Sequence, residues 1–174
     1  MSQLGPIFID ITWGAGGSTS NLTTEFVKTA HEQFGLETCM HLTCTNMPKE
    51  KIDTALKEAY EFGCENILAL RGDPPKGSTE WTATEGGFEH AIDLVVSLNK
   101  YVGKMYPQLA FAQNRHIRAG YGDHFDIAVA GFPEGHMHSS LTKEQETIYL
   151  KEKIDAGANF IFTQMFYDVD IFID

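Results

Sequence analysis

The sequence is poor in positive charge and has no long apolar run. Its 174 residues contain 13 Lys and Arg against 24 Asp and Glu, a formal net charge of -11. A protein that neutralises a phosphate backbone needs a basic face, so this composition argues against nucleic acid as a partner. No stretch of about 18 apolar residues occurs, and no basic start precedes an apolar segment. We therefore expect a cytoplasmic protein without a membrane span or a secretory signal.

Cysteine is scarce, and the usual metal and nucleotide signatures are missing. The three cysteines, Cys39, Cys44 and Cys64, form no Cys-x-x-Cys pair, which indicates reduced thiols and no zinc site. HMH at residues 136–138 lacks a carboxylate pattern and is more typical of a polar loop than of a metal site. GAGGST at residues 14–19 has neither the third glycine of a dinucleotide fingerprint nor the Gly-Lys-Ser/Thr of a phosphate loop. The alternative to a nucleotide-binding loop is that this stretch forms only a strand-to-helix turn.

Hydrophobic residues make up 43% of the chain, enough for one domain with a real core. Between short apolar runs lie segments whose apolar residues recur at helical spacing and so form a stripe on one face of a helix. The clearest such stripe consists of Ile52, Ala55, Leu56, Ala59 and Tyr60, and its helix is expected to end at Gly63. Similar stripes occur within residues 26–34 and 88–95. Thr142 and Gln145 predict a capping box that opens a helix through Ile154. The apolar runs predict five buried strands at residues 7–13, 39–44, 66–73, 125–132 and 160–167.

Strands that alternate with helices predict a parallel sheet with right-handed crossovers. The third and fourth predicted strands are separated by about twice the length that one such unit needs. The excess falls at residues 96–114, which we expect to form an irregular insertion outside the core.

Polar residues lie near the carboxyl ends of four of the five predicted strands. Because side chains alternate along a strand, one face of each should carry the following sets: Phe8, Asp10 and Thr12; His41 and Thr43; Ile67, Ala69, Arg71 and Asp73; Phe160, Phe162 and Gln164. Recurrence on successive strands favours a barrel active site over the single crevice of a doubly wound sheet. Taken alone, His41 is more typical of a satisfied core histidine. A surface Arg-Gly-Asp at 71–73 is disfavoured, because the triplet ends a buried strand.

Read together, the strand ends carry a specific combination of motifs. DITWGAGG, MHLTCTN, NILALRGDPP, VAGFPEGH and DAGANFIFTQMFYD occur in this order. The set strongly resembles the eukaryotic methylenetetrahydrofolate reductase family. The resemblance implies an α/β fold, a partial (β/α)8 TIM barrel with about strands 2 to 6 present, in which residues 1–174 form a single FAD-binding domain. It also implies a homo-oligomeric full-length enzyme that reduces 5,10-methylenetetrahydrofolate to 5-methyltetrahydrofolate with NADPH or NADH, by ping-pong hydride transfer through non-covalent FAD.

The family's site residues carry over by motif. The resemblance places Asp73 against both flavin and folate, where its carboxylate would stabilise a cationic folate intermediate. It places Gln164 on the pterin, since an amide both donates and accepts hydrogen bonds. It assigns FAD contacts to Thr12, Trp13, Ala15, His41, Arg71, Gly72, Asp73, His90, Ala91, Ala130, Phe132, His136, Ser139, Glu146 and Lys153, with His90 and Ala91 on the adenosine and Lys153 near the diphosphate.

One family element has no match in this sequence. The family's general acid is a glutamate on the first barrel strand, and no residue here corresponds to it, so we expect the chain alone to be inactive. Phe132 stands in place of a usual tyrosine, Glu146 in place of an aspartate, and residues 137–139 in place of a Pro-Glu-Ala-like stretch. Two alternatives stay open: a non-catalytic fragment of such an enzyme, or another flavin barrel such as a proline dehydrogenase relative. The TQMF glutamine and the LRGD strand favour folate.

Overall fold

Five parallel strands alternate with helices in the computed structural model, which describes residues 2–13, 20–74, 77–78, 80–105, 124–137 and 139–173. The strands are β1 (Ile9–Ile11), β2 (Thr38–Thr43), β3 (Asn66–Leu70), β4 (Asp126–Gly131) and β5 (Phe160–Thr163). A short 3-10 turn, η1 (Ser2–Leu4), precedes the helices α1 (Ser20–Phe34), α2 (Lys49–Glu61), α3 (Ala91–Met105), α4 (Lys143–Asp155) and α5 (Val169–Ile173). Each strand lies largely within a run that the sequence predicted.

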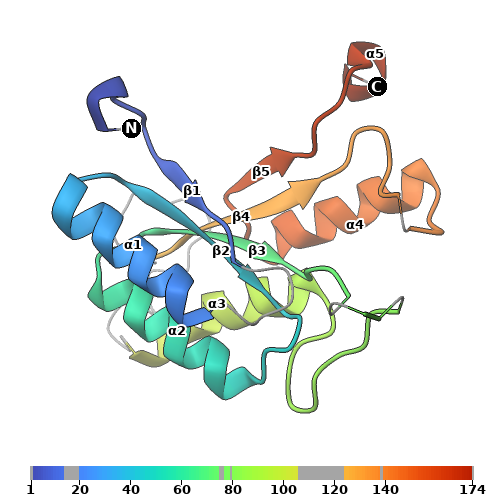
Figure 1. Cartoon of the computed structure of the whole chain (residues 1–174). Coiled ribbons are helices and arrows are strands. Elements are labelled where there is room, and N and C mark those ends of the chain that lie inside the picture. The colour runs from blue at the N-terminus through green and yellow to red at the C-terminus, as the bar shows by residue number, and fades with distance from the viewer. Residues whose placement is uncertain are drawn as a thin grey trace.

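The strands are ordered β1-β2-β3-β4-β5, and every neighbouring pair is parallel. Right-handed crossovers between sequential strands put all connecting helices on one face, and Figure 1 shows α1 to α4 following one another around the outside of the sheet. The sheet is strongly curled. In a flat sheet the outermost strands would lie about 19 Å apart, yet Phe8, just before β1, stacks on Phe162 of β5 with ring centroids 5.9 Å apart. This is the arrangement of a partial TIM barrel.

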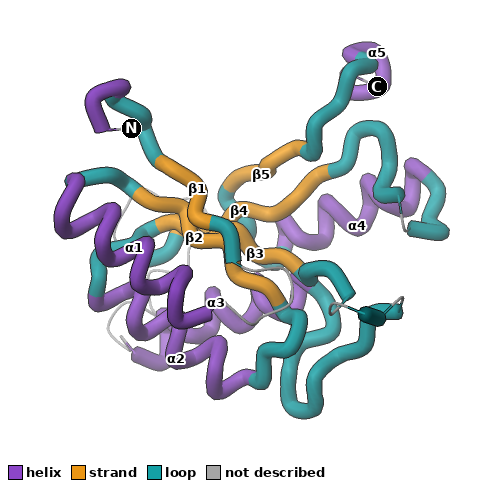
Figure 2. The backbone as a smooth tube through the Cα atoms, viewed as in Figure 1, coloured by secondary structure: helices purple, strands orange, loops and turns teal. Residues whose placement is uncertain are grey.

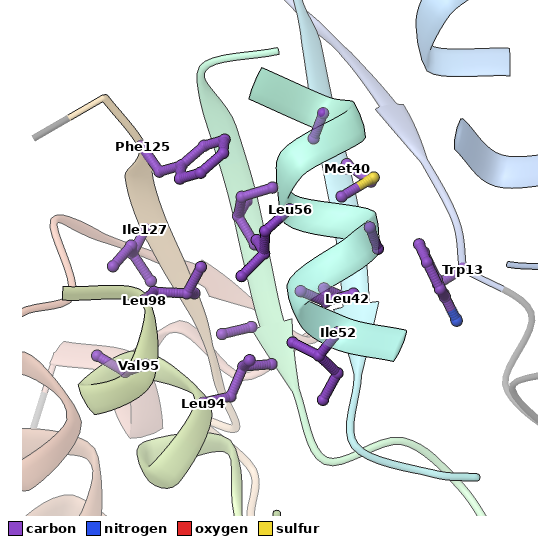
Figure 3. Packing of buried hydrophobic residues seen from close by; sticks show 14 of the residues in the cluster. Trp13, Met40, Leu42, Ile52, Leu56, Leu94, Val95, Leu98, Phe125 and Ile127 are labelled. Carbon is purple, nitrogen blue, oxygen red and sulfur yellow. The ribbon is translucent and has the colours of Figure 1, made fainter. Parts of the chain in front are cut away.

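The main core lies between the outer face of the sheet and helices α1, α2 and α3. On β2 and β3 it contains the residue pairs Met40–Ile67 and Leu42–Ala69, which are aligned in register. Figure 3 shows α2 lying over these strands, with Leu56 and Ile52 directed at them. Both side chains are completely buried. The predicted apolar stripe of α2 and its end near Gly63, whose φ is +79°, are confirmed.

A smaller cluster lies on the inner face of the curled sheet. It contains Cys39, Leu68 and Ala128, with Leu70, Phe160 and Phe162 packed against it. This face corrects one prediction. Ile67 and Ala69 were grouped with Arg71 and Asp73 as the polar-bearing face of β3, but they belong to the helix-covered core. The strand ends at Leu70 and Gly72 adopts a φ of +87°, so strict alternation does not continue into the turn.

The predicted irregular insertion at residues 96–114 is wrong for its first part. Residues 96–105 continue α3, and Leu98 is buried in the main core. The physical reason is an apolar stripe at Ala91, Leu94, Val95 and Leu98, which has helical spacing. Residues 106–114 lie outside the described residues, so that part of the prediction stays a prediction. No helix in the described part of the chain combines the length and apolar character needed to cross a membrane.

Candidate active site

The carboxyl ends of the five parallel strands meet along one edge of the sheet. Figure 2 shows the loops that follow β2, β3 and β4 leaving the sheet on this side. Ligand sites of parallel barrels lie at this edge, because the loops that follow the strands surround it. Most of the residues that the resemblance assigned to cofactor and substrate lie here, in four groups.

The first group joins β1 and β2 on the inner face. His41 Nε2 lies 3.2 Å from Asp10 Oδ1, and the His41 side chain is only 16% exposed. A carboxylate that accepts from one ring nitrogen fixes the orientation of the imidazole and leaves the other nitrogen for a further partner. His41 is therefore a positioned group rather than an isolated core histidine. Asp10 was placed on the same face from the sequence but was not assigned to the site.

The second group is the turn after β3. The Arg71 guanidinium lies over the Trp81 ring, with Cζ 5.3 Å from the centroid, a cation–π arrangement. The Arg71 carbonyl accepts from the backbone N–H groups of Cys44 and Thr45, and the Thr45 hydroxyl lies within hydrogen-bonding distance of the Asp73 carbonyl. The Asp73 residue itself is exposed. The turn thus has a fixed backbone and presents a carboxylate to the surface.

The third group lies between the start of α3 and α4. Lys153 is 6% exposed, its Nζ donates to the Ala130 carbonyl at 2.8 Å, and it lies 5.2 Å from the centroid of the Tyr149 ring. The Tyr149 ring also makes an edge contact with the His90 ring, with the two centroids 6.5 Å apart. His90 opens α3, and its N–H donates to Asp93 Oδ2 at 2.9 Å.

Burial sets the protonation chemistry of this third group. It lowers the pKa of Lys153 to about 8, since the ammonium loses solvation, although the nearby Glu146 carboxylate acts in the opposite direction. It raises the pKa of the Tyr149 phenol, with Asp93 adding to the effect. It also raises the pKa of the Cys44 thiol, whose Sγ lies 3.7 Å from the His90 carbonyl, to about 12. Of these three groups, Lys153 has the pKa closest to neutral pH.

The fourth group lines a cavity of about 340 Å³ beside the β4–α4 loop. Glu146 Oε1 accepts from the His136 N–H at 3.3 Å, and the Ser139 N–H donates to the His136 carbonyl. The Phe132 ring makes an edge contact with the His136 ring at 4.5 Å. The cavity is lined by Pro133, Glu134, Gly135, His136, Met137, Ser139, Leu141, Lys143, Glu146 and Ile171. It brings together three residues that the resemblance assigned to FAD, namely His136, Ser139 and Glu146.

The segment after β5 is tied to the same loop. The Gln164 N–H donates to the Gly131 carbonyl at 2.7 Å, which keeps the two strands paired up to the exposed glutamine. Glu134 Oε1 accepts from the Tyr167 and Asp168 N–H groups at 2.8 and 3.0 Å. These two bonds lower the pKa of the Glu134 carboxyl. The backbone around Gln164 is thus fixed on both sides.

The remaining predicted residues are less directly placed. The Trp13 indole is 1% exposed and belongs to the main core, so its side chain packs against the helices rather than facing solvent. The Thr12 carbonyl lies 3.4 Å from the Thr23 hydroxyl, and Ala91 is the partly buried first residue of α3. Ala15 and the GAGGST stretch lie outside the described residues, as does His138.

Thr45, Trp81, Tyr149 and Glu134 are among the residues of these groups that were not anticipated from the sequence. Tyr149 could have been found, because it lies four residues before Lys153 on one helix and such pairs are neighbours. Thr45 and Trp81 are joined only by the path of a loop, and no periodic pattern indicates that contact. In the described part of the chain, no cluster of three or more His, Cys, Asp or Glu side chains could hold a metal ion.

Comparison with known proteins identifies the family. The methylenetetrahydrofolate reductase family model matches residues 1–174. Methylenetetrahydrofolate reductase 2 of Saccharomyces cerevisiae is 53% identical over 173 residues, covering 97% of this chain and 25% of that protein. Methylenetetrahydrofolate reductase (NADH) 1 of Zea mays is 48% identical over 177 residues, covering 97% of this chain and 27% of that protein. The chain therefore spans about a quarter of the length of these curated relatives.

A solved structure supports the fold independently of sequence. A protein assigned as a phosphonomutase from Burkholderia cenocepacia superposes with a TM-score of 0.62 at 9% identity, covering 98% of this chain and 65% of that one. At this identity the likeness concerns the fold alone. The match along the whole chain is what establishes kinship: this chain belongs to the methylenetetrahydrofolate reductase family.

Proposed function

We propose that this chain forms the flavin-binding part of an oxidoreductase that reduces 5,10-methylenetetrahydrofolate to 5-methyltetrahydrofolate with NADPH or NADH. The observation that carries the proposal is the family match over residues 1–174, combined with the polar groups at the carboxyl edge of the sheet. Because the chain spans about a quarter of its relatives, we assign the activity to the full-length protein.

The chemistry of the donor groups fits FAD. The chain as a whole carries a net charge of -11, yet this edge holds the Arg71 guanidinium, the buried Lys153 ammonium and the imidazoles of His41, His90 and His136 beside its carboxylates. Cations and N–H donors at one edge of an acidic protein suit an anionic diphosphate. FAD, when bound, supplies a carrier for hydride between the nicotinamide and the folate.

The groups described above divide the binding task. We assign the adenosine and diphosphate to His90, Ala91, His136, Ser139, Glu146 and Lys153, which lie at the start of α3, in the β4–α4 loop and on α4. Lys153 would hold the diphosphate with N–H groups other than the one directed at Ala130, since an ammonium has three. We assign the remaining flavin contacts to Thr12, Ala15, His41, Arg71, Gly72, Asp73, Ala130 and Phe132, and to the backbone of Trp13, because its indole is buried in the main core.

Two side chains would handle the folate. Gln164 follows β5, and its amide can both donate to and accept from the pterin edge. Asp73 presents its carboxylate at the turn after β3, where a negative charge would stabilise a cationic methylene intermediate as it forms. Asp73 is therefore the residue of this chain that we expect to act on the reacting atoms.

A chimera tests this proposal. Residues 1–174 would replace the stretch that they match in the Saccharomyces cerevisiae relative, and the rate of flavin reoxidation by methylenetetrahydrofolate would be measured by stopped flow. We expect turnover in the chimera, and a loss of about 10²-fold in that rate with Asp73→Asn, because an amide cannot neutralise the cation. FAD content should stay unchanged.

Asp155→Asn is the matched control. This carboxylate is exposed near the end of α4, where it pairs with Lys151, and its loss should leave the rate unchanged. A chimera without folate-dependent turnover would contradict the proposed function. An active chimera whose rate is indifferent to Asp73→Asn would remove Asp73 from the mechanism and leave the function in place.

A further inference from the structure

A single buried hydroxyl oxygen lies at the centre of the turn that presents Arg71 and Asp73. Thr45 follows β2 by two residues and is completely buried. Its Oγ1 lies 3.1 Å from the Arg71 carbonyl, 2.9 Å from the Asp73 carbonyl and 2.8 Å from the Trp81 Nε1. Three groups from two other segments of the chain thus converge on one side-chain atom.

The donors and acceptors can be assigned. An indole N–H only donates, so Thr45 Oγ1 accepts from Trp81 and has one proton of its own to give. The Arg71 carbonyl already accepts from the Cys44 and Thr45 N–H groups at 3.0 and 3.1 Å, which fills its two lone pairs. The hydroxyl proton therefore goes to the Asp73 carbonyl, the nearer of the two.

The turn is shaped to fit this hydroxyl. Gly72 has a φ of +87°, a conformation that favours glycine, and a Cβ built there would lie 2.6 Å from Thr45 Oγ1. The same Cβ would lie 3.0 Å from Thr43 Cβ. The backbone of the turn therefore packs directly on Thr45 with no space for a side chain between them.

The second bond of the hydroxyl acts on Arg71. The bond from Trp81 Nε1 to Thr45 anchors one end of the indole, and the face of that ring supports the Arg71 guanidinium at 5.3 Å. One oxygen atom thus sets the backbone at Asp73 and the platform of Arg71 at the same time.

We propose that Thr45 is a positioning residue for the reaction, which fixes the Asp73 carboxylate and the Arg71 guanidinium through its hydroxyl, with Trp81 as the intermediary on the arginine side. The inference rests on the proposed function, because it assumes that Asp73 and Arg71 face the folate and the flavin. It adds two residues, Thr45 and Trp81, that touch neither ligand and act through the turn.

Three variants in the yeast chimera separate positioning from simple stabilisation. Thr45→Val keeps the size of the side chain and removes the hydroxyl; Thr45→Ser keeps the hydroxyl and removes the methyl group. We expect Thr45→Val to slow flavin reoxidation by methylenetetrahydrofolate between about tenfold and about 100-fold, the cost of a misplaced reacting group. Thr45→Ser should restore the rate to within about threefold. Trp81→Phe keeps an aromatic platform without the N–H and should slow the reaction by about three- to tenfold.

Thr24→Val is the matched control, because Thr24 is also buried and its hydroxyl also bonds a backbone carbonyl, that of Asn21 in α1. It should lower the melting temperature about as much as Thr45→Val does, without changing the folate rate. A purely structural role for Thr45 would give the same pattern in both variants.

The outcomes are distinct. An active chimera in which Thr45→Val folds and reacts at the parental rate would overturn the inference alone. If Thr45→Val fails to fold, Trp81→Phe decides, and a parental rate in that variant overturns the inference. A chimera that binds FAD but shows no folate turnover would overturn the proposed function, and the inference with it.

Discussion

Helices α2 and α4 are both 13 residues long but are held in place by different interactions. α2 buries Ile52, Ala55, Leu56 and Ala59, whereas the one buried residue of α4 is Lys153. Ile148 and Ile154 of α4 are 59% and 36% exposed. α2 is thus fixed by apolar packing on the sheet, while α4 has little packing of that kind.

Polar contacts, rather than apolar packing, hold α4 in place. Thr142 and Gln145 form a complete capping box at its start, Glu146 accepts from the β4–α4 loop, and Lys153 donates to β4. Glu146 and Lys153 also belong to the candidate site. The comparison teaches that α2 contributes apolar side chains to the core, whereas α4 contributes polar side chains to the candidate site. The two helices should therefore respond differently to mutation.

Removing core volume from α2 should have the largest effect on stability. Leu56→Ala creates a cavity among fully buried neighbours and should lower the free energy of unfolding by about 2–5 kcal/mol. The matched change on α4, Ile148→Ala, should stay within about 0.5 kcal/mol, because the side chain is already exposed. Denaturant unfolding followed by circular dichroism measures both. Equal losses would contradict the distinction between the two helices.

The buried ammonium of α4 should give a pH dependence that α2 lacks. The pKa of Lys153 falls from 10.5 to about 8 on folding, so the folded state binds fewer protons between these pH values. The contribution of Lys153 to stability should therefore rise by about 1–3 kcal/mol as the pH increases from 8 to 10.5, while the buried Cys39 and Cys44 thiols, whose pKa is raised, contribute in the opposite direction. The difference in melting temperature between the parent and Lys153→Met across that range isolates the lysine, and this difference should grow with pH. The same pH dependence in both proteins would assign the effect to other groups.

The smallest of the three effects concerns the capping box. Thr142→Ala removes the hydroxyl that accepts from the Gln145 N–H and should cost about 1 kcal/mol. Thr142→Ser retains the acceptor and serves as the control. Amide hydrogen exchange should show faster opening of the first turn of α4 in the alanine variant, with α2 unchanged. Uniformly faster exchange in both helices would show that α4 does not open independently.

Sequence patterns predicted the packed side of the molecule better than the polar side. The stripe of α2 fixed its buried face because helical spacing and apolar character coincide at Ile52, Leu56 and Ala59. The predicted polar-bearing face of β3 was wrong. Ile67, Leu68, Ala69 and Leu70 are apolar on both faces of the strand, so the alternation of residues does not show which face is covered by helices. Continuing the alternation through Gly72 then extended this wrong assignment to Arg71 and Asp73 in the turn.

The site was predictable as a set of strand ends but not as a set of contacts. A parallel sheet places the polar residues after β2, β3 and β5 at one edge whatever their partners are. The bond between Thr45 and Trp81 spans 36 residues and depends on how the loop after β3 returns. The edge contact of His90 with Tyr149 depends likewise on the mutual placement of α3 and α4. Neither leaves a local signal in the sequence.

The strand order has a consequence for how the chain can fold during synthesis. Among the described strands, each one after β1 pairs with the strand that precedes it in the sequence, so none of these pairs must wait for a strand made much later. Pairing of sequential strands keeps loop-closure entropy small, and it allows the sheet to grow from the first β-α-β unit as the chain leaves the ribosome at about 5–20 residues per second. The step from β3 to β4 crosses the longest connection in this chain, and it should be the slowest addition. At that moment the nascent protein would expose the edge of β3, which makes this the interval in which a chaperone has most to protect.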